Sequence, residues 1–137
     1  MVLLIDTNIL LDILQHRIPF YEASKKILDL CGKREAEGYI ALHSVSNIYF
    51  ILRKQYSTEQ RCLLLSGVLK VLHVCGIGHE GVVNALERKD FADFEDCLQD
   101  ECACSVNASY IITRNVNDFK NSKVKAVTPE QFLSITG

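Results

Sequence analysis

Short, mainly apolar runs recur along this 137-residue chain, and longer segments with helical spacing separate them. Each run is too brief for a helix and suits a strand that is covered on both faces. The predicted strands are residues 2–5, 39–42, 73–77, 110–113 and 124–127. Because buried strands that alternate with helices are typical of βαβ units, the chain is predicted to fold around a parallel sheet of the α/β class.

The intervening segments carry apolar residues at i, i+3/i+4 spacing and begin at residues that favour helix starts. Predicted helices run over residues 8–15, from Pro19 to Gly32 or Gly38, from Ser44 or Ser46 to Tyr56, from Ser57 through Leu72, from His79 or Glu80 to Lys89, from Asp93 to about Ala108, and after Thr128-Pro129. No repeat or linker interrupts the pattern, so residues 1–137 are predicted to form a single domain.

Composition narrows the function classes. Fifteen Lys and Arg residues stand against 17 Asp and Glu residues, so any surface for nucleic acid has to be a local basic patch. No stretch approaches the roughly 18 apolar residues of a membrane helix, and the opening run has no basic flank and reaches Asp6 too soon for a signal peptide. The six cysteines form no C-x-x-C pair and are interpreted as small buried residues in a reducing compartment. We therefore expect a cytoplasmic protein with no membrane segment.

Polar and acidic residues gather where the predicted strands end, which is where open parallel sheets bind ligands. Asp6, Thr7 and Asn8 follow the first strand. Asp93 and Asp96 open the helix before the fourth strand, and Asn115 and Asp118 follow the fourth strand. Each acid has a purely structural alternative, because Asp6 can cap a helix, Asp93 and Asp96 have the shape of a capping box, and Asp118 suits an Asx turn.

The convergence of these acids on one edge of the sheet favours a functional site. Carboxylates that are brought close together repel one another unless a cation lies among them. A hard divalent cation, Mg²⁺ or Mn²⁺, is the natural partner of such oxygen ligands. The sequence therefore predicts a divalent-metal site at this edge.

Three segments resemble the signature segments of the PIN domain family: Leu3-Leu-Ile-Asp6-Thr-Asn8-Ile-Leu-Leu-Asp12, Asp93-Phe-Glu-Asp96-Cys-Leu-Gln99 and Ile111-Ile-Thr-Arg-Asn115-Val-Asn-Asp118-Phe119. The closing Val127-Thr128-Pro129-Glu-Gln-Phe132-Leu is also similar to that family's usual ending. The resemblance runs from residue 2 to about residue 133, and the order and spacing of the segments make it specific.

This resemblance implies a PIN-like, three-layer α/β/α sandwich with a central, mainly parallel sheet of about five short strands. It implies an endoribonuclease that uses Mg²⁺ or Mn²⁺ to cleave single-stranded RNA, often as the toxin of a toxin–antitoxin pair with a small antitoxin partner and a homodimeric state. By position, Asp6, Asp96 and Asp118 match the family's first, third and fourth acids and are the expected catalytic metal ligands. Thr113 or Asn115 matches a polar residue that helps to hold the site.

The sequence departs from the family at one position. The second acid is usually a Glu in the helix after the second strand, and the aligned residue here is Asn47. An amide can coordinate through its oxygen or hold a metal-bound water, but it adds no negative charge. Either Glu95 or Asp93 points into the pocket and compensates, or the metal site is weak. A weak site leaves the alternative of a PIN-like module that binds RNA or a protein partner without cleavage.

RNA contacts are expected from basic residues near the pocket, Arg114 and Lys120 among them, although a solvated charged surface explains each equally well. Tyr21, Tyr49 and Phe50 have faces that can stack a base, but core packing is the favoured interpretation.

Other α/β enzymes with acids at the same edge do not fit the sequence. A phospho-receiver needs paired acids after its first strand, and a haloacid-dehalogenase-type phosphatase needs D-x-D there, where this chain has Asp6-Thr7-Asn8. The Walker A pattern is absent as well.

Overall fold

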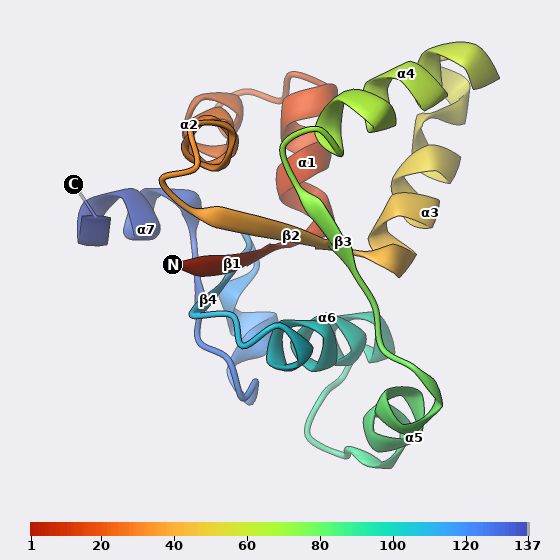
Figure 1. Ribbon diagram of the computed structural model, residues 1–137. Helices are drawn as coiled ribbons and strands as arrows, with labels where there is room; N and C mark the ends of the chain where they lie inside the picture. Colours follow the sequence, from red (N-terminus) through yellow and green to blue (C-terminus); the bar gives the residue numbers. More distant parts are fainter. Residues whose placement is uncertain (137) are drawn as a thin grey trace.

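The computed structural model describes residues 1–136 and places a five-stranded, all-parallel sheet at the centre of this part of the chain (Figure 1). The strand order is β3-β2-β1-β4-β5. The strands are β1 (Val2–Ile5), β2 (Glu37–Ala41), β3 (His73–Cys75), β4 (Tyr110–Ile112) and β5 (Ala126–Val127). In this register Leu4 of β1 lies between Tyr39 of β2 and Ile111 of β4.

Helices connect the strands, as expected for parallel neighbours. Within residues 1–136 they are α1 (Thr7–Leu14), α2 (Tyr21–Gly32), α3 (Leu42–Ile51), α4 (Thr58–Val68), α5 (His79–Glu87), α6 (Phe94–Ser105) and α7 (Pro129–Thr136). Two short 3₁₀ helices, η1 (Leu52–Lys54) and η2 (Val116–Phe119), follow α3 and β4.

The sheet separates two hydrophobic clusters, which gives the three layers of an α/β/α sandwich. Leu3 and Ile5 pack on one face with apolar side chains of α1, α2, α3, α4 and α7. Leu4 packs on the other face with α6 and with Phe119 of η2, and α5 lies outside against α6. Because β1 is buried on both faces, its sequence is uniformly apolar instead of alternating. The predicted fold class is confirmed.

The strand order creates a switch point at β1. The chain moves from β1 to β2 on one side and later crosses to β4 on the other side. At such a point the connections leave the carboxyl ends of neighbouring strands in opposite directions and open a crevice between them. Asp6 directly follows β1 and Thr113 directly follows β4, so these two residues stand at the crevice.

Several element boundaries differ from the sequence-based expectation. Helix α2 begins at Tyr21, because Pro19 lies in the turn that precedes it. Strand β2 ends at Ala41, and Leu42 opens α3 with 62% of its surface exposed. The helix expected to reach Tyr56 ends at Ile51 and is followed by the 3₁₀ helix η1, and α4 begins separately at a capping box of Ser57 and Gln60.

None of the helices in the described part of the chain is long and apolar enough to span a bilayer.

Candidate metal-binding active site

Asp6 serves two purposes at the end of β1. Its backbone is extended, and its Oδ1 accepts a hydrogen bond of 2.8 Å from the backbone N–H of Thr7, so it is the N-cap of α1. The capping alternative considered from the sequence is therefore correct. The same side chain also lines a pocket of about 400 Å³ at the carboxyl end of the sheet, so capping and a functional role coexist.

Two further side chains fix the Asp6 carboxylate. Thr113 donates its hydroxyl to Oδ2 at 2.7 Å, and Gln99 donates its amide Nε2 to Oδ1 at 3.1 Å. Asp6 is only 6% exposed. Burial raises its pKa above the ordinary value, while the hydrogen bonds from Thr113, Thr7 and Gln99 act in the opposite direction. The site thus contains a buried carboxylate whose ionised form is held by donors on three different elements.

Helix α6 brings a second carboxylate to the pocket. Asp96 and Gln99 are three residues apart and therefore share one face of the helix, and both line the pocket. Asp96 is half-buried, and its pKa is raised to about 7, first by burial and then by repulsion from Asp6, Asp93, Asp118 and Glu95. This raised pKa therefore reflects burial first and, after it, the negative charge of the neighbouring acids.

Asp93 and Glu95 have different roles although both flank Asp96. Asp93 is the N-cap of α6, because its carboxylate accepts the N–H of Glu95 at 2.8 Å, and it is absent from the residues that line the pocket. Glu95 lines the pocket and accepts a hydrogen bond from the amide nitrogen of Asn47, which extends from α3. The structure therefore places Asn47 at the site and turns Glu95, not Asp93, toward it.

The pocket offers oxygen atoms that lack partners. No salt bridge among residues 1–136 involves Asp6, Asp96 or Glu95. Oδ1 of Asn8 and Oε1 of Gln99, both from pocket-lining residues, are buried without a hydrogen-bond partner in this part of the chain. Unpaired carboxylates and orphaned amide oxygens fit a hard divalent cation, which takes oxygen ligands and supplies positive charge.

The segment after β4 contributes Asn115 and Asp118 differently. Asn115 lines the pocket, and its backbone N–H donates to Thr113 Oγ1 at 3.1 Å. Asp118 lies on η2 with an exposed side chain and is outside the set of pocket-lining residues. Its charge is close enough to Asp96 to raise the pKa of that residue. Asp118 therefore stands at the margin of the pocket.

The two basic residues expected near the site, Arg114 and Lys120, differ in whether an acidic side chain already pairs with them. Arg114 forms a 2.7 Å ion pair with the fully buried Asp12 and places its guanidinium over the ring of Phe20. Arg114 thus links the segment after β4 to α1, which gives it a structural role, and the RNA contact expected from the sequence stays a prediction. Lys120 is exposed directly after η2, with no ion pair among residues 1–136.

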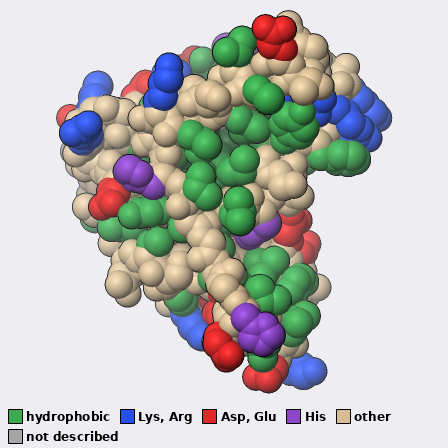
Figure 2. Space-filling model, turned by 45° about the vertical axis from the view of Figure 1, so that its right-hand side comes forward, with side chains coloured by type: hydrophobic (Ala, Val, Ile, Leu, Met, Phe, Trp, Pro, Cys, Tyr) green, Lys and Arg blue, Asp and Glu red, His purple; other side chains and the backbone are tan. Residues whose placement is uncertain are grey.

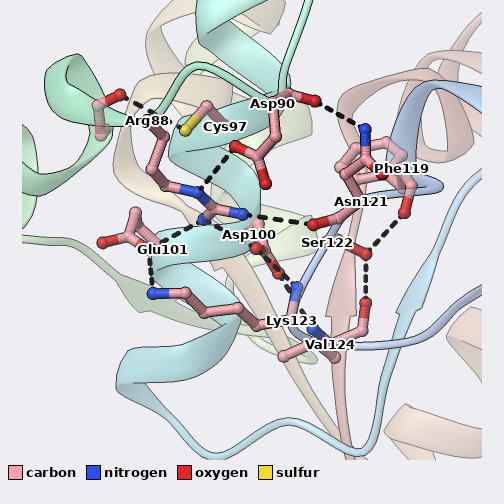
Figure 3. Close-up of polar contacts among 11 residues, drawn as sticks. Arg88, Asp90, Cys97, Asp100, Glu101, Phe119, Asn121, Ser122, Lys123 and Val124 are labelled. Carbon is pink, nitrogen blue, oxygen red and sulfur yellow. Dashed lines mark hydrogen bonds and ion pairs between the residues drawn. The ribbon is translucent and has the colours of Figure 1, made fainter.

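A second acidic cluster lies elsewhere on α6 and is neutralised by the protein itself (Figure 3). The side chains of Asp100, Glu101 and Cys104 lie within metal-ligating distance of one another. Arg88 pairs with Asp100 at 2.8 Å and with Glu101 at 3.0 Å, so the positive charge is already present. Asp100 also accepts the backbone N–H groups of residues 123 and 124, which ties the loop after η2 to α6.

Sequence reasoning missed two polar residues of the site, Ser44 and Gln99. Thr7 Oγ1 donates to Ser44 Oγ at 2.7 Å, and Gln99 Nε2 donates to Ser44 Oγ at 2.8 Å, which joins α1, α3 and α6 behind the pocket. The i+3 spacing of Gln99 from Asp96 was the one available signal. Core packing was the wrong interpretation for Phe50, which lines the pocket with 59% of its surface exposed.

Comparisons with known proteins agree with this geometry. The family model of the PIN domain matches residues 2–117. No curated protein is significantly similar in sequence. Among solved structures, VapBC2 from Rickettsia felis bound to a promoter DNA fragment superposes with a TM-score of 0.71 at 18% identity, covering 93% of this chain and 98% of that one.

Two other structures show the same fold. A toxin–antitoxin complex from Klebsiella pneumoniae superposes with a TM-score of 0.69 at 24% identity, covering 92% of this chain and 96% of that chain. VapC20 from Mycobacterium tuberculosis, described as a toxin that cleaves the sarcin–ricin loop, has a TM-score of 0.63 at 12% identity, with 80% and 86% covered.

Proposed function

The chain belongs to the PIN domain family, and from this premise we propose that it is a metal-dependent endoribonuclease that cleaves single-stranded RNA. One observation carries the proposal: Asp6, directly after β1, and Asp96, on α6, line one pocket at the switch point of the sheet, and no protein cation pairs with either among residues 1–136. Two carboxylates without a protein cation are stabilised by a positive charge that binds in the pocket. A divalent cation provides that charge, and it can also polarise the phosphate of an RNA backbone.

Asp6 and Asp96 hold the proposed Mg²⁺ or Mn²⁺, with Asp118 at the margin as a third acid. When bound, the cation polarises the phosphate and lowers the pKa of a water molecule, which favours hydrolysis to a 3′-hydroxyl and a 5′-phosphate. Thr113 and Gln99 orient the Asp6 carboxylate through their hydrogen bonds. Such partners behind a ligand reduce the freedom of its oxygens and favour binding.

RNA contacts are proposed for residues at the rim of the pocket. Phe50 is exposed there, with the guanidinium of Arg53 above its ring at 3.7 Å from the centroid. An exposed aromatic ring stacks a base regardless of its identity, and an adjacent cation attracts the phosphate. Asn115 and the exposed Lys120 lie on the other side, after β4.

We also propose that the protein is the toxin of a toxin–antitoxin pair, with a small antitoxin as its partner and a homodimeric state. Solved structures with the same fold include toxin–antitoxin complexes. Figure 2 shows hydrophobic side chains gathered on the face formed by β3, α3, α4 and α5. A second pocket of about 520 Å³ on this face is lined by Leu42, Val82 and Leu98 among others. Contiguous exposed apolar surface of this kind is typical of protein interfaces.

The cytoplasm is the proposed location, because RNA substrates and reducing conditions are found there. All six cysteines are free, which fits a reducing compartment.

Degradation of single-stranded RNA tests the proposed activity. Wild type is compared with Asp6→Asn and Asp96→Asn in the presence of Mn²⁺ or Mg²⁺, and with Glu22→Gln, which removes an exposed acid on α2 that is outside the set of pocket-lining residues. We expect cleavage by wild type and by Glu22→Gln, and loss of cleavage in the two pocket variants. If wild type cleaves no more than the pocket variants at any metal concentration, the chain is a PIN-like binding module that acts without cleavage.

A further inference from the structure

We propose that Glu95 is the additional acidic ligand of this pocket and takes the place of the acid that α3 lacks at Asn47. The inference rests on the proposed metal-dependent function and specifies its ligand set. It follows from the position of Glu95, from the direction of its hydrogen bond with Asn47, and from the unpartnered oxygen of Gln99 in the same pocket wall.

The first turn of α6 holds Glu95 at the pocket. Asp93 caps this turn by accepting the N–H of Glu95, which fixes the backbone from which the side chain extends. Glu95 and Asp96 are consecutive, and both line the pocket. The start of α6 therefore delivers two neighbouring carboxylates to one cavity, whereas α3 delivers none.

The contact between Asn47 and Glu95 shows what α3 and α6 each contribute to the pocket. Asn47 directs its amide nitrogen at Oε1 of Glu95 and so acts as a donor to the carboxylate. An acid at position 47 would instead place two negative charges in contact, which costs energy without a cation between them. The pair thus combines one acid and one amide across the pocket, with the acid on α6.

An independent feature of the pocket points to a ligand at the same place. Gln99 is 2% exposed and uses its Nε2 on Asp6 and Ser44, while its Oε1 is buried with no partner among the described residues. A buried acceptor without a donor is unfavourable unless an ion or a water satisfies it. Gln99 lines the same pocket as Asp6, Asp96 and Glu95, so each of these four side chains offers oxygen atoms there.

A structural explanation for Glu95 also exists and can be tested separately. A Glu in the first turn of a helix interacts favourably with the helix dipole and needs no ligand. Glu80 provides a matched control, because it is the second residue of α5 as Glu95 is of α6, and it is exposed with no ion pair in the described part of the chain. A dipole effect is common to both positions, whereas metal binding is specific to Glu95.

The test measures Mn²⁺ binding to the full chain by calorimetry, together with thermal unfolding without metal. We expect Glu95→Gln to weaken Mn²⁺ binding by about tenfold or more, and Glu80→Gln to leave it unchanged. The exchange variant Asn47→Glu/Glu95→Gln restores an acid and an amide on opposite helices, and most of the affinity should return. Wild-type affinity in Glu95→Gln overturns the inference, and so does an exchange variant that binds no better than Glu95→Gln.

The same experiment separates this inference from the proposed function. Asp96→Asn is measured in parallel. If Asp96→Asn weakens Mn²⁺ binding and Glu95→Gln does not, the metal site stands and the role of Glu95 is refuted. If wild type binds no Mn²⁺, the proposed metal-dependent function itself fails. An unfolding temperature of Glu95→Gln close to that of wild type shows that loss of binding does not come from loss of fold.

Discussion

The raised pKa of Asp96 predicts that metal binding depends strongly on pH near neutrality. With a pKa of about 7, the carboxyl group is about one-tenth ionised at pH 6 and about nine-tenths ionised at pH 8. A cation binds the ionised form and competes with the proton. The apparent affinity for Mn²⁺, measured by calorimetry in buffers matched in ionic strength, should therefore rise about tenfold between these pH values.

The same group predicts the opposite trend for the stability of the metal-free protein. Its ordinary pKa is 3.8, and the folded state raises it to about 7. Between these values the folded protein keeps a proton that the unfolded chain has released, so the contribution of Asp96 to stability falls as pH rises through this window. Urea unfolding without metal should show this loss in wild type, and a smaller loss in Asp96→Asn, which has no proton to release.

Two results would refute the reasoning. One is a wild-type affinity for Mn²⁺ that is flat between pH 6 and pH 8, because Asp96 would then be ionised throughout or absent from the ligand set. The other is an unchanged pH dependence in Asp96→Asn, since another group would then be responsible. Glu22→Gln is the control and should follow wild type in both measurements, because Glu22 is an exposed acid on α2.

Three substitutions test other contacts. Arg114→Leu removes the 2.7 Å partner of the buried Asp12 carboxylate and leaves it only Arg17, at 3.7 Å. We expect a loss of about 3 kcal/mol in the free energy of unfolding and about 10 °C in Tm. Adding Asp12→Asn should recover part of the loss, whereas a purely RNA-binding role for Arg114 leaves Tm unchanged. Thr113→Val removes the donor to Oδ2 of Asp6 and should lower the free energy of unfolding in urea by about 1–3 kcal/mol; no change would show that Oδ2 is solvated. Phe50→Ala removes an exposed ring at the pocket rim and should weaken single-stranded RNA binding by about 1–3 kcal/mol in a filter or fluorescence assay, with Tm preserved; equal RNA binding would exclude stacking.

Much of the fold could be predicted from local sequence. Uniformly apolar runs such as Val2–Ile5 gave the strands, since burial on both faces leaves no polar positions. Element ends were less predictable. Leu42 is apolar and is predicted to end the strand, yet it opens α3 at the surface. The prediction fails there because nothing in a short apolar segment distinguishes the end of a strand from the start of a helix.

The residues of the site also fall into those that the local sequence predicts and those that only the structure identifies. The acids at Asp6 and Asp96 follow from where the strand and the helix begin and end, and capping by Asp93 follows from its place before α6. Which of the consecutive polar residues turns into the pocket depends on the rotation of α6 against the sheet. That rotation is set by packing between distant segments, and it brings in Gln99 as well as Glu95.

The sequence by itself determined the class of fold, the edge of the sheet where the acids gather, and the absence of an acid at Asn47, because these depend on local periodicity and on residue identity. Only the tertiary structure decided that Glu95 meets Asn47 across the pocket and that Arg114 is held by Asp12. The two members of each pair are 48 and 102 residues apart. Contacts of that range are fixed by strand order and helix packing, which no local pattern encodes.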